Sequence, residues 1–355
     1  MNLVRPLLGL LALLAFAQPA APEALGAARV PEAELGSEFW SVAARFDSGH
    51  HLVLELCITN VGFGDGNAAV IGHLIEPDGT VHAFDGASRD GEWSLSQDRL
   101  HVRVKGVELD QRRPVHHLRV DKRRVKLDLD FEPGGSDLRL AAFGGPDRGF
   151  DLLALEAPAR AILQMPGEEE EVLVGRVART HRWSEGLESG FLLRRIELFT
   201  LRGDVEAYLV DVLDPDGGSR SWLTVQRDGE VLRSQPVEVQ PVWGIVEGPS
   251  GFPVPEGLTV TGEQVRGHVD LRPSLVRYDP LADLPAVVRW AISPFLRWRA
   301  TWSESPFELE LTGDPGGPLT LRGRGLANVT YFNSIGEAPA VAAPPPALPC
   351  GADCP

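Results

Sequence analysis

The sequence predicts an all-β protein with two antiparallel β domains in tandem. The clearest strand pattern runs from Val125 to Phe131, where apolar residues alternate with Lys126, Asp128 and Asp130 and so share one face of a strand. Short segments of this kind follow one another over Ser37–Pro158, each closed by Gly, Pro, Asp or Asn residues. The pattern resumes in the second half of the chain, which therefore repeats the architecture of the first.

The N-terminus has the features of a secretory signal peptide. One positive charge, Arg5, precedes an apolar run from Leu7 to Phe16 that is too short to span a bilayer as a helix. A small-x-small pattern at Ala15–Ala17 fits the cleavage site. We therefore expect a signal peptide over residues 1–17, export to the periplasm or outside the cell, and no integral membrane segment in the mature chain.

Composition narrows the class of protein further. A formal net charge of −16 argues against a nucleic-acid partner. With only three cysteines, the chain is not a disulfide-built scaffold, so its core must supply the stability. Cys57 lies in the alternating segment His51–Thr59 and is expected to be a small core residue. Cys350 and Cys354 are expected to form a disulfide in the tail.

Four consecutive glutamates mark the expected domain boundary. They lie in the segment Met165–Glu171, after a proline and a glycine, which indicates a solvated break more than a metal site. The first β domain is therefore placed at 37–164 and the second at 172–336. Residues 337–355 form an Ala/Pro-rich tail that is expected to be extended and flexible.

Turn signals divide the second half into strands in the same way. The segments Glu206–Val212 and Trp222–Gln226 are separated by the turn Asp214–Gly218, and Asp228–Gly229 precedes a further strand. Ala286–Ile292 is the best short helix candidate.

Several short stretches resemble one known family. They are Glu38-Phe39-Trp40, Thr59-Asn60-Val61-Gly62, the strand Leu127–Phe131 closed by Glu132-Pro133, Gly175 with His181-Arg182-Trp183, and Gly323-Arg324-Gly325 with Asn328–Tyr331. In these stretches the chain resembles the tandem lipocalin-like proteins, which include carotenoid hydratases of the hydroxyneurosporene synthase type, fungal survival-factor proteins and related cyclases. The resemblance implies two packed calycin-like barrels with an apolar cavity.

The histidine motif departs from that of the hydratases. His181 and Trp183 match a histidine and a tryptophan that the family places in an Asp-His-Asn-Trp-Gly context. Here the flanking residues are Thr180, Arg182 and Ser184. The carboxylate expected beside the histidine is missing, and a histidine without an orienting carboxylate is a poorer candidate for the positioned acid that protonates an alkene. Glu185 or Glu188 could approach His181 if the following loop folds back.

The candidate site residues follow from the resemblance and from the tryptophans. His181 is the candidate catalytic acid. The candidate ligand-binding residues are Trp40, Trp183, Trp222 and Trp243, because indole rings commonly line apolar pockets, and Asn60, which lies in one of the stretches that carry the resemblance. Trp298 and Trp302 share a strand face with Leu296 and are expected in the core.

No metal or cofactor is expected. The pairs His50-His51 and His116-His117 are adjacent on strands, so the two rings of each pair point to opposite faces. The chain has no phosphate-cradling loop, dinucleotide fingerprint or Gly-x-Ser-x-Gly elbow.

The leading hypothesis is an exported protein that binds an apolar small molecule, a lipid or isoprenoid-like ligand, in a cavity with almost wholly apolar walls. One alternative is a hydratase or cyclase that acts on an isoprenoid or polyene, in which His181 faces a cavity with a carboxylate in reach and Trp183 stabilises positive charge. The other is an envelope structural or adhesion module whose barrels are filled with side chains.

Overall fold

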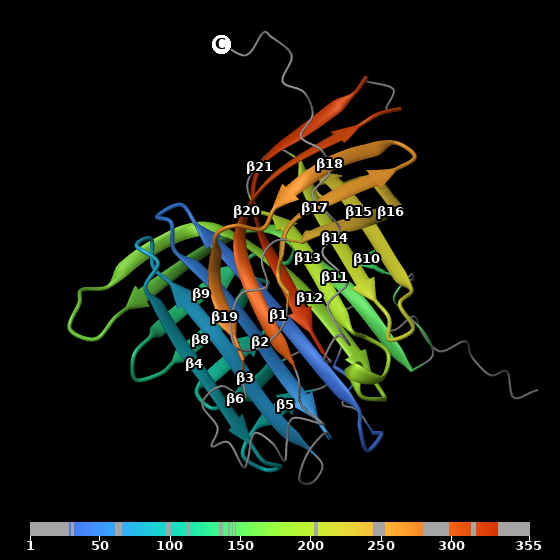
Figure 1. Cartoon of the computed structure of the whole chain (residues 1–355). Coiled ribbons are helices and arrows are strands. Elements are labelled where there is room, and N and C mark those ends of the chain that lie inside the picture. The colour runs from blue at the N-terminus through green and yellow to red at the C-terminus, as the bar shows by residue number, and fades with distance from the viewer. Residues whose placement is uncertain are drawn as a thin grey trace, which may run out of the picture.

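The computed structural model describes residues 28–29, 32–60, 66–96, 101–111, 114–134, 138–140, 143, 145, 147–201, 205–243, 253–279, 298–313 and 317–332. Over these residues the protein is built from β-strands (Figure 1), which confirms the predicted fold class. The signal peptide, the helix at Ala286–Ile292, the tail and the pair Cys350 and Cys354 lie outside the described residues. None of the described segments forms a helix with the length and apolar character needed to cross a membrane.

The first sheet contains twelve strands and curls into a half-barrel. In chain order they are β1 (Ser37–Phe46), β2 (His51–Thr59), β3 (Asn67–Ile75), β4 (Val81–Ser88), β5 (Ser94–Ser96), β6 (His101–Val104), β7 (Val107–Asp110), β8 (His116–Asp121), β9 (Lys126–Phe131), β10 (Leu138–Arg139), β11 (Arg148–Gln164) and β12 (Glu171–Ser184). Their order across the sheet is β4-β3-β2-β1-β12-β11-β9-β8-β7-β6-β5, with β10 beside β11. At the centre of the sheet, β1 is therefore adjacent to β12 although the two strands are far apart in sequence, and β11 lies on the other side of β12.

The second sheet closes into a barrel of eight strands. Its strands are β13 (Arg194–Thr200), β14 (Glu206–Leu213), β15 (Ser219–Arg227), β16 (Glu230–Trp243), β17 (Pro255–Gly262), β18 (Val265–Asp270), β19 (Ser274–Tyr278), β20 (Arg299–Leu311) and β21 (Leu319–Tyr331). The order β18-β17-β16-β15-β14-β13-β21-β20 becomes a ring because β18 also pairs with β20, and β19 adds to β20. An antiparallel eight-stranded barrel is the architecture that the lipocalin-like resemblance implies.

Apolar alternation explains which faces are buried. In β9 the apolar residues Leu127, Leu129 and Phe131 are buried and the charged residues between them are exposed, as their spacing predicts. They belong to the core inside the half-barrel. In β2, by contrast, both faces are buried, because a second core packs between the two sheets. This second core brings residues such as Val53 against the barrel.

The expected boundary at Met165–Glu171 lies within the first sheet. This segment is the turn between β11 and β12, which pair along their length, and its glutamates are exposed. The chain passes from the first sheet to the second after Ser184, through the 3-10 turn η2 (Glu188–Gly190), and enters β13 at Arg194. Exposed charge is equally suited to a hairpin turn and to a linker, so composition alone does not separate the two.

Candidate functional site

Three central strands of the half-barrel bring the candidate site together. His181 of β12 lies directly opposite Trp40 of β1 on one side and Asp151 of β11 on the other. One row further along, Trp183 lies opposite Glu38 and Gly149. Because residues two apart share a face of a strand, these side chains all lie on the inner face of the half-barrel, where Trp40 packs into the core.

His181 is held between two buried carboxylates. Its Nε2 lies 2.7 Å from Glu38 Oε1, and its Nδ1 lies 3.5 Å from Asp151 Oδ2. The second distance is long for a hydrogen bond and is that of an ion pair when the ring is protonated. All three side chains are 1% exposed or less. This histidine therefore has no contact with bulk water.

Two indole rings flank the imidazole. The ring of Trp40 stacks on His181 with a centroid distance of 5.6 Å and an interplanar angle of 16°, and that of Trp183 with 5.3 Å and 27°. Trp183 fits there because its opposite residue is a glycine: a Cβ at Gly149 would lie 1.9 Å from the Trp183 ring. The electron-rich faces of indoles stabilise positive charge nearby, so this arrangement favours an imidazolium.

Each carboxylate has a further cationic or amide partner. Asp151 pairs with Arg139 through Nε at 2.9 Å. Glu38 accepts the main-chain N–H of Arg29 at 2.9 and 3.1 Å to its two oxygens, and the Arg29 guanidinium lies 3.7 Å above the Trp183 ring. The two acids are thus fixed in position before any ligand arrives.

The protonation state of His181 follows from these contacts. Burial, the largest influence, lowers the pKa of a histidine, but hydrogen bonds and charges from Asp151 and Glu38 together outweigh it and raise the pKa of His181 above its ordinary value. The site therefore favours the protonated form of the imidazole in a dry environment beside two indoles. An acid of this kind is what protonation of a carbon–carbon double bond requires.

The expectation that His181 lacks an orienting carboxylate is wrong. No carboxylate is adjacent to His181 in the chain, but the structure supplies Glu38 from β1 and Asp151 from β11. Of the two acids expected to approach His181, Glu185 accepts the main-chain N–H of Ala33 at 3.0 Å. Glu188 pairs with Arg182 at 3.0 Å. Glu38 stands two residues before Trp40, so the strand register would have been the signal that revealed it.

The structure brings Trp40 and Trp183 to His181 and places the other candidates elsewhere. The Asn60 side chain donates to the Ala33 carbonyl at 2.9 Å and accepts from Gly66 N–H at 2.9 Å. Trp222 donates to Ser234 at 2.7 Å. Trp243 lies in β16, 5.6 Å from the Arg194 guanidinium. These three residues hold loops and barrel strands in contacts that do not include His181.

A second polar cluster, termed here the arginine cluster, occupies the opposite face of the same strands. It consists of Ser41, Glu55, Arg182, Glu188, Arg195, Glu197 and Tyr208. Arg182 donates to Glu55 at 2.8 Å and to Ser41 at 3.1 Å. Arg195 donates to Glu197 at 2.7 Å, which also accepts from Tyr208 at 2.8 Å. This cluster lies between the two sheets.

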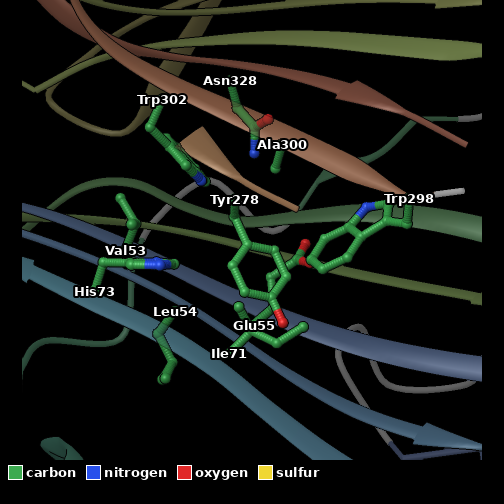
Figure 2. A pocket seen from close by; sticks show the side chains of 10 residues that line it. All are labelled: Val53, Leu54, Glu55, Ile71, His73, Tyr278, Trp298, Ala300, Trp302 and Asn328. Carbon is green, nitrogen blue, oxygen red and sulfur yellow. The ribbon is translucent and has the colours of Figure 1, made fainter. Parts of the chain in front are cut away.

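Two small cavities also lie between the sheets. The first has a volume of about 10 Å³ and is walled by β2, β3 and the strands β19 to β21. Figure 2 shows Glu55 and Asn328 as polar groups among its aromatic rings, which include Trp298 and Trp302. The second has a volume of about 40 Å³ and is lined by several arginines and phenylalanines. Neither has the nearly apolar walls or the size expected of a lipid carrier.

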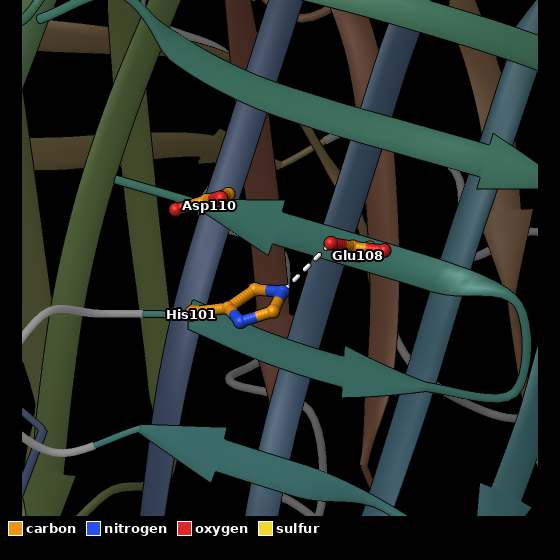
Figure 3. Close-up of side chains that lie close together, drawn as sticks. All are labelled: His101, Glu108 and Asp110. Atoms are coloured by element: carbon orange, nitrogen blue, oxygen red, sulfur yellow. Dashed lines mark hydrogen bonds and ion pairs between the residues drawn. The ribbon is translucent and has the colours of Figure 1, made fainter. Parts of the chain in front are cut away.

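One group of side chains in the described part of the chain could hold a metal ion. His101, Glu108 and Asp110 offer ligand atoms within 4.8 Å of one another on β6 and β7 (Figure 3). His101 lies 2.7 Å from Glu108, which Arg103 also contacts at 2.7 Å. These contacts are those of cross-strand ion pairs on a sheet surface. His116 and His117 face opposite ways, toward Arg179 and Asp130 respectively, as their adjacency predicts.

Solved structures of other proteins have a similar fold, although no similarity is found at the level of sequence families. No protein-family model matches the sequence, and no curated protein matches it. A protein of Nitrosomonas europaea provisionally assigned as AttH has a TM-score of 0.61 at 14% identity, over 84% of this chain and 93% of that one. CghA in complex with Sch210972 has a TM-score of 0.60 at 12% identity, over 87% and 94%.

Kievitone hydratase of Nectria haematococca has a TM-score of 0.55 at 13% identity, over 87% of this chain and 94% of that one. At such identities the likeness is one of fold. The similarity covers both sheets, so the tandem arrangement expected from the sequence resemblance is confirmed at the level of the fold.

Proposed function

We propose that the protein is an enzyme that protonates a carbon–carbon double bond of an apolar small molecule, either adding water or steering a cyclisation, with His181 as the acid. The observation that carries the proposal is the buried imidazole held by Glu38 and Asp151 between two indole rings. Such a set meets the needs of a general acid: a fixed orientation, a raised pKa and surroundings that stabilise positive charge.

Both reactions balance in atoms and protons with the alkene, His181 and, for hydration, one water molecule. The π electrons of the alkene take the proton from His181 and form a C–H bond, which leaves a cation on the other carbon. In hydration a water oxygen forms the C–O bond and its proton returns to the imidazole, so the alkene and water give an alcohol. In cyclisation a second double bond supplies the electron pair that forms the new C–C bond, and the neutral imidazole then takes a proton from a carbon next to the cation, which gives an isomer and restores the acid. Trp40 and Trp183 stabilise the cationic stage.

The fold comparisons favour this function over a carrier. One similar structure is a hydratase and another holds a small molecule. The two cavities between the sheets are small and partly charged, unlike the apolar interior of a lipid carrier. A purely structural module gives no reason to bury an acid between two carboxylates, because such burial carries a large desolvation cost. Export by a signal peptide over residues 1–17 remains part of the proposal.

The test is turnover in heavy-oxygen water. The protein is incubated with lycopene, squalene and a prenylated flavonoid in H₂¹⁸O, and products are searched by mass spectrometry for the added mass of one labelled water or for isomers. His181→Gln is expected to lower the rate by about 10²–10⁴-fold, and Glu38→Gln to lower it similarly.

Glu185→Gln is the matched control, because this acid was expected near His181 and lies away from it. It should keep the wild-type rate. Turnover by His181→Gln at the wild-type rate would contradict the assignment. Stoichiometric binding of a panel member without any product would instead support the carrier hypothesis.

A further inference from the structure

We propose that the larger cavity between the sheets is a binding site for a carboxylate carried by an aromatic small molecule, with Arg182 and Arg195 as its anchors. Its anchor Arg182 lies on the opposite face of β12 from His181. Trp183, which stacks on His181, also lines the cavity, so the two sites share this side chain. The two anchors take no part in the protonation chemistry, and the proposal does not depend on it.

The walls of this cavity combine cationic and aromatic groups. Four arginines line it, Arg148, Arg182, Arg195 and Arg220, against one carboxylate, that of Glu188. The rest of the wall is apolar and includes four aromatic side chains: Phe143, Phe150, Trp183 and Phe191. A few convergent charged groups within an otherwise apolar wall are typical of sites for small organic anions.

Buried donors of the two anchors lack acceptors. Arg182 uses Nε for Glu188 and Nη1 for Glu55, and its Nη2 has no hydrogen-bond partner among the described residues. Arg195 uses Nε for Glu197, and neither of its Nη atoms has a hydrogen-bond partner in that part of the chain. Arg195 Nη2 lies 3.7 Å from Glu55 Oε1, and Arg195 Nη1 lies 4.0 Å from Glu188 Oε1. The side chains are 5% and 1% exposed, and buried donors of this kind need an acceptor.

The ion pairs orient the free donors toward a ligand. Glu55, Glu188 and Glu197 fix the guanidinium planes, which leaves Nη2 of Arg182 and both Nη atoms of Arg195 available. A carboxylate matches such a fork because two of its oxygens can accept parallel N–H bonds. Arg148 adds a further cation: its guanidinium lies 4.7 Å from the Phe191 ring centroid, and it forms no ion pair with the described carboxylates.

The size of the cavity limits what fits. About 40 Å³ holds a few atoms, such as a carboxylate group or one or two water molecules. The free space admits the carboxylate group alone, so binding of the attached aromatic body requires the phenylalanine side chains of the wall to move apart and pack against it. Water alone would also satisfy the donors, and a site filled only by water would show no preference for anions.

The test is isothermal titration of the full chain with trans-cinnamate and with cinnamyl alcohol, its neutral counterpart. We expect cinnamate to bind at least tenfold more tightly than the alcohol. Arg195→Lys keeps the charge and the pairing with Glu197 but loses the fork, and should weaken cinnamate binding at least tenfold. Arg148→Gln changes a partly exposed position and should weaken cinnamate binding several-fold. It tests the proposal if Arg195→Lys fails to fold.

Arg324→Gln is the matched control, because Arg324 is 56% exposed and pairs with Glu304 away from the cavity. It should bind cinnamate as the wild type does. Equal binding of cinnamate and cinnamyl alcohol, no binding of cinnamate, or wild-type affinity in a folded Arg195→Lys would each overturn the proposal. Inorganic phosphate that competes with cinnamate at equal concentration would overturn the preference for a carboxylate.

Discussion

His181 and Arg182 are consecutive residues of β12, yet they belong to two different buried polar clusters. His181 faces the inside of the half-barrel, where one imidazole meets two carboxylates and two indoles. Arg182 faces the second sheet, where guanidinium groups and carboxylates alternate. Strand alternation explains the separation. One strand thus supplies both a candidate acid and a candidate anion site.

The pKa shifts on the two faces show that burial alone does not determine whether a side chain is charged. Burial, the largest influence in each case, is outweighed at His181 by Glu38 and Asp151, which raise its pKa. On the face between the sheets, burial prevails at His51 and His73 and lowers the pKa of each to about 4. At Glu55 the charges of Arg182 and Arg195 overcome burial and lower the pKa. The number of fixed opposite charges decides the outcome.

The largest expected effect comes from breaking the arginine cluster. Arg182→Ala leaves Glu55 buried without a hydrogen-bonded cation, because Arg195 Nη2 is 3.7 Å away, and removal of one partner of a buried pair costs about 3–5 kcal/mol of unfolding free energy. Urea unfolding measures the loss. Arg324→Ala removes an exposed ion pair and should cost less than about 1 kcal/mol. Equal losses in the two variants would show that burial of the cluster adds nothing.

An intermediate effect is expected from crowding the histidine site. In Gly149→Ala the new Cβ would meet the Trp183 ring, so the indole must turn away from His181, at a cost of about 1–3 kcal/mol. Near-ultraviolet circular dichroism should report the moved indole. Gly190→Ala, where no atom lies within 4 Å of the added Cβ, should stay within about 0.5 kcal/mol of the wild type. An unchanged spectrum in Gly149→Ala would mean that Trp183 is not held there.

The sequence predicts the strands and turns that are marked by residues close together in the chain. Alternation locates β9, and β2 has the bounds His51–Thr59 that were expected from it. The Asp228–Gly229 turn joins β15 and β16, with positive φ at both residues, as its residue types favour. Pairings between distant strands leave no such pattern. Asp151 reaches His181 only through the register of β11 with β12, which shifts twice along the pair, so the acid partners could not be predicted from spacing.

The smallest expected effect comes from a change of pH, to which the histidines on the two faces respond in opposite directions. The raised pKa of His181 gives stability that is complete below its unfolded value of about 6.5 and is lost as the pH rises through the folded value. The pKa of about 4 at His73 gives stability that is present above 6.5 and is lost as the pH falls toward 4. Nuclear magnetic resonance of labelled histidines should show His181 protonated above pH 6.5 and His73 neutral down to about 4.

The free energy of unfolding should change with pH in the same opposite senses. The stability difference between wild type and His181→Gln should shrink as the pH rises through the folded pKa, whereas that between wild type and His73→Gln should shrink as the pH falls. A shared midpoint near 6.5 for both histidines would remove the distinction between the two faces.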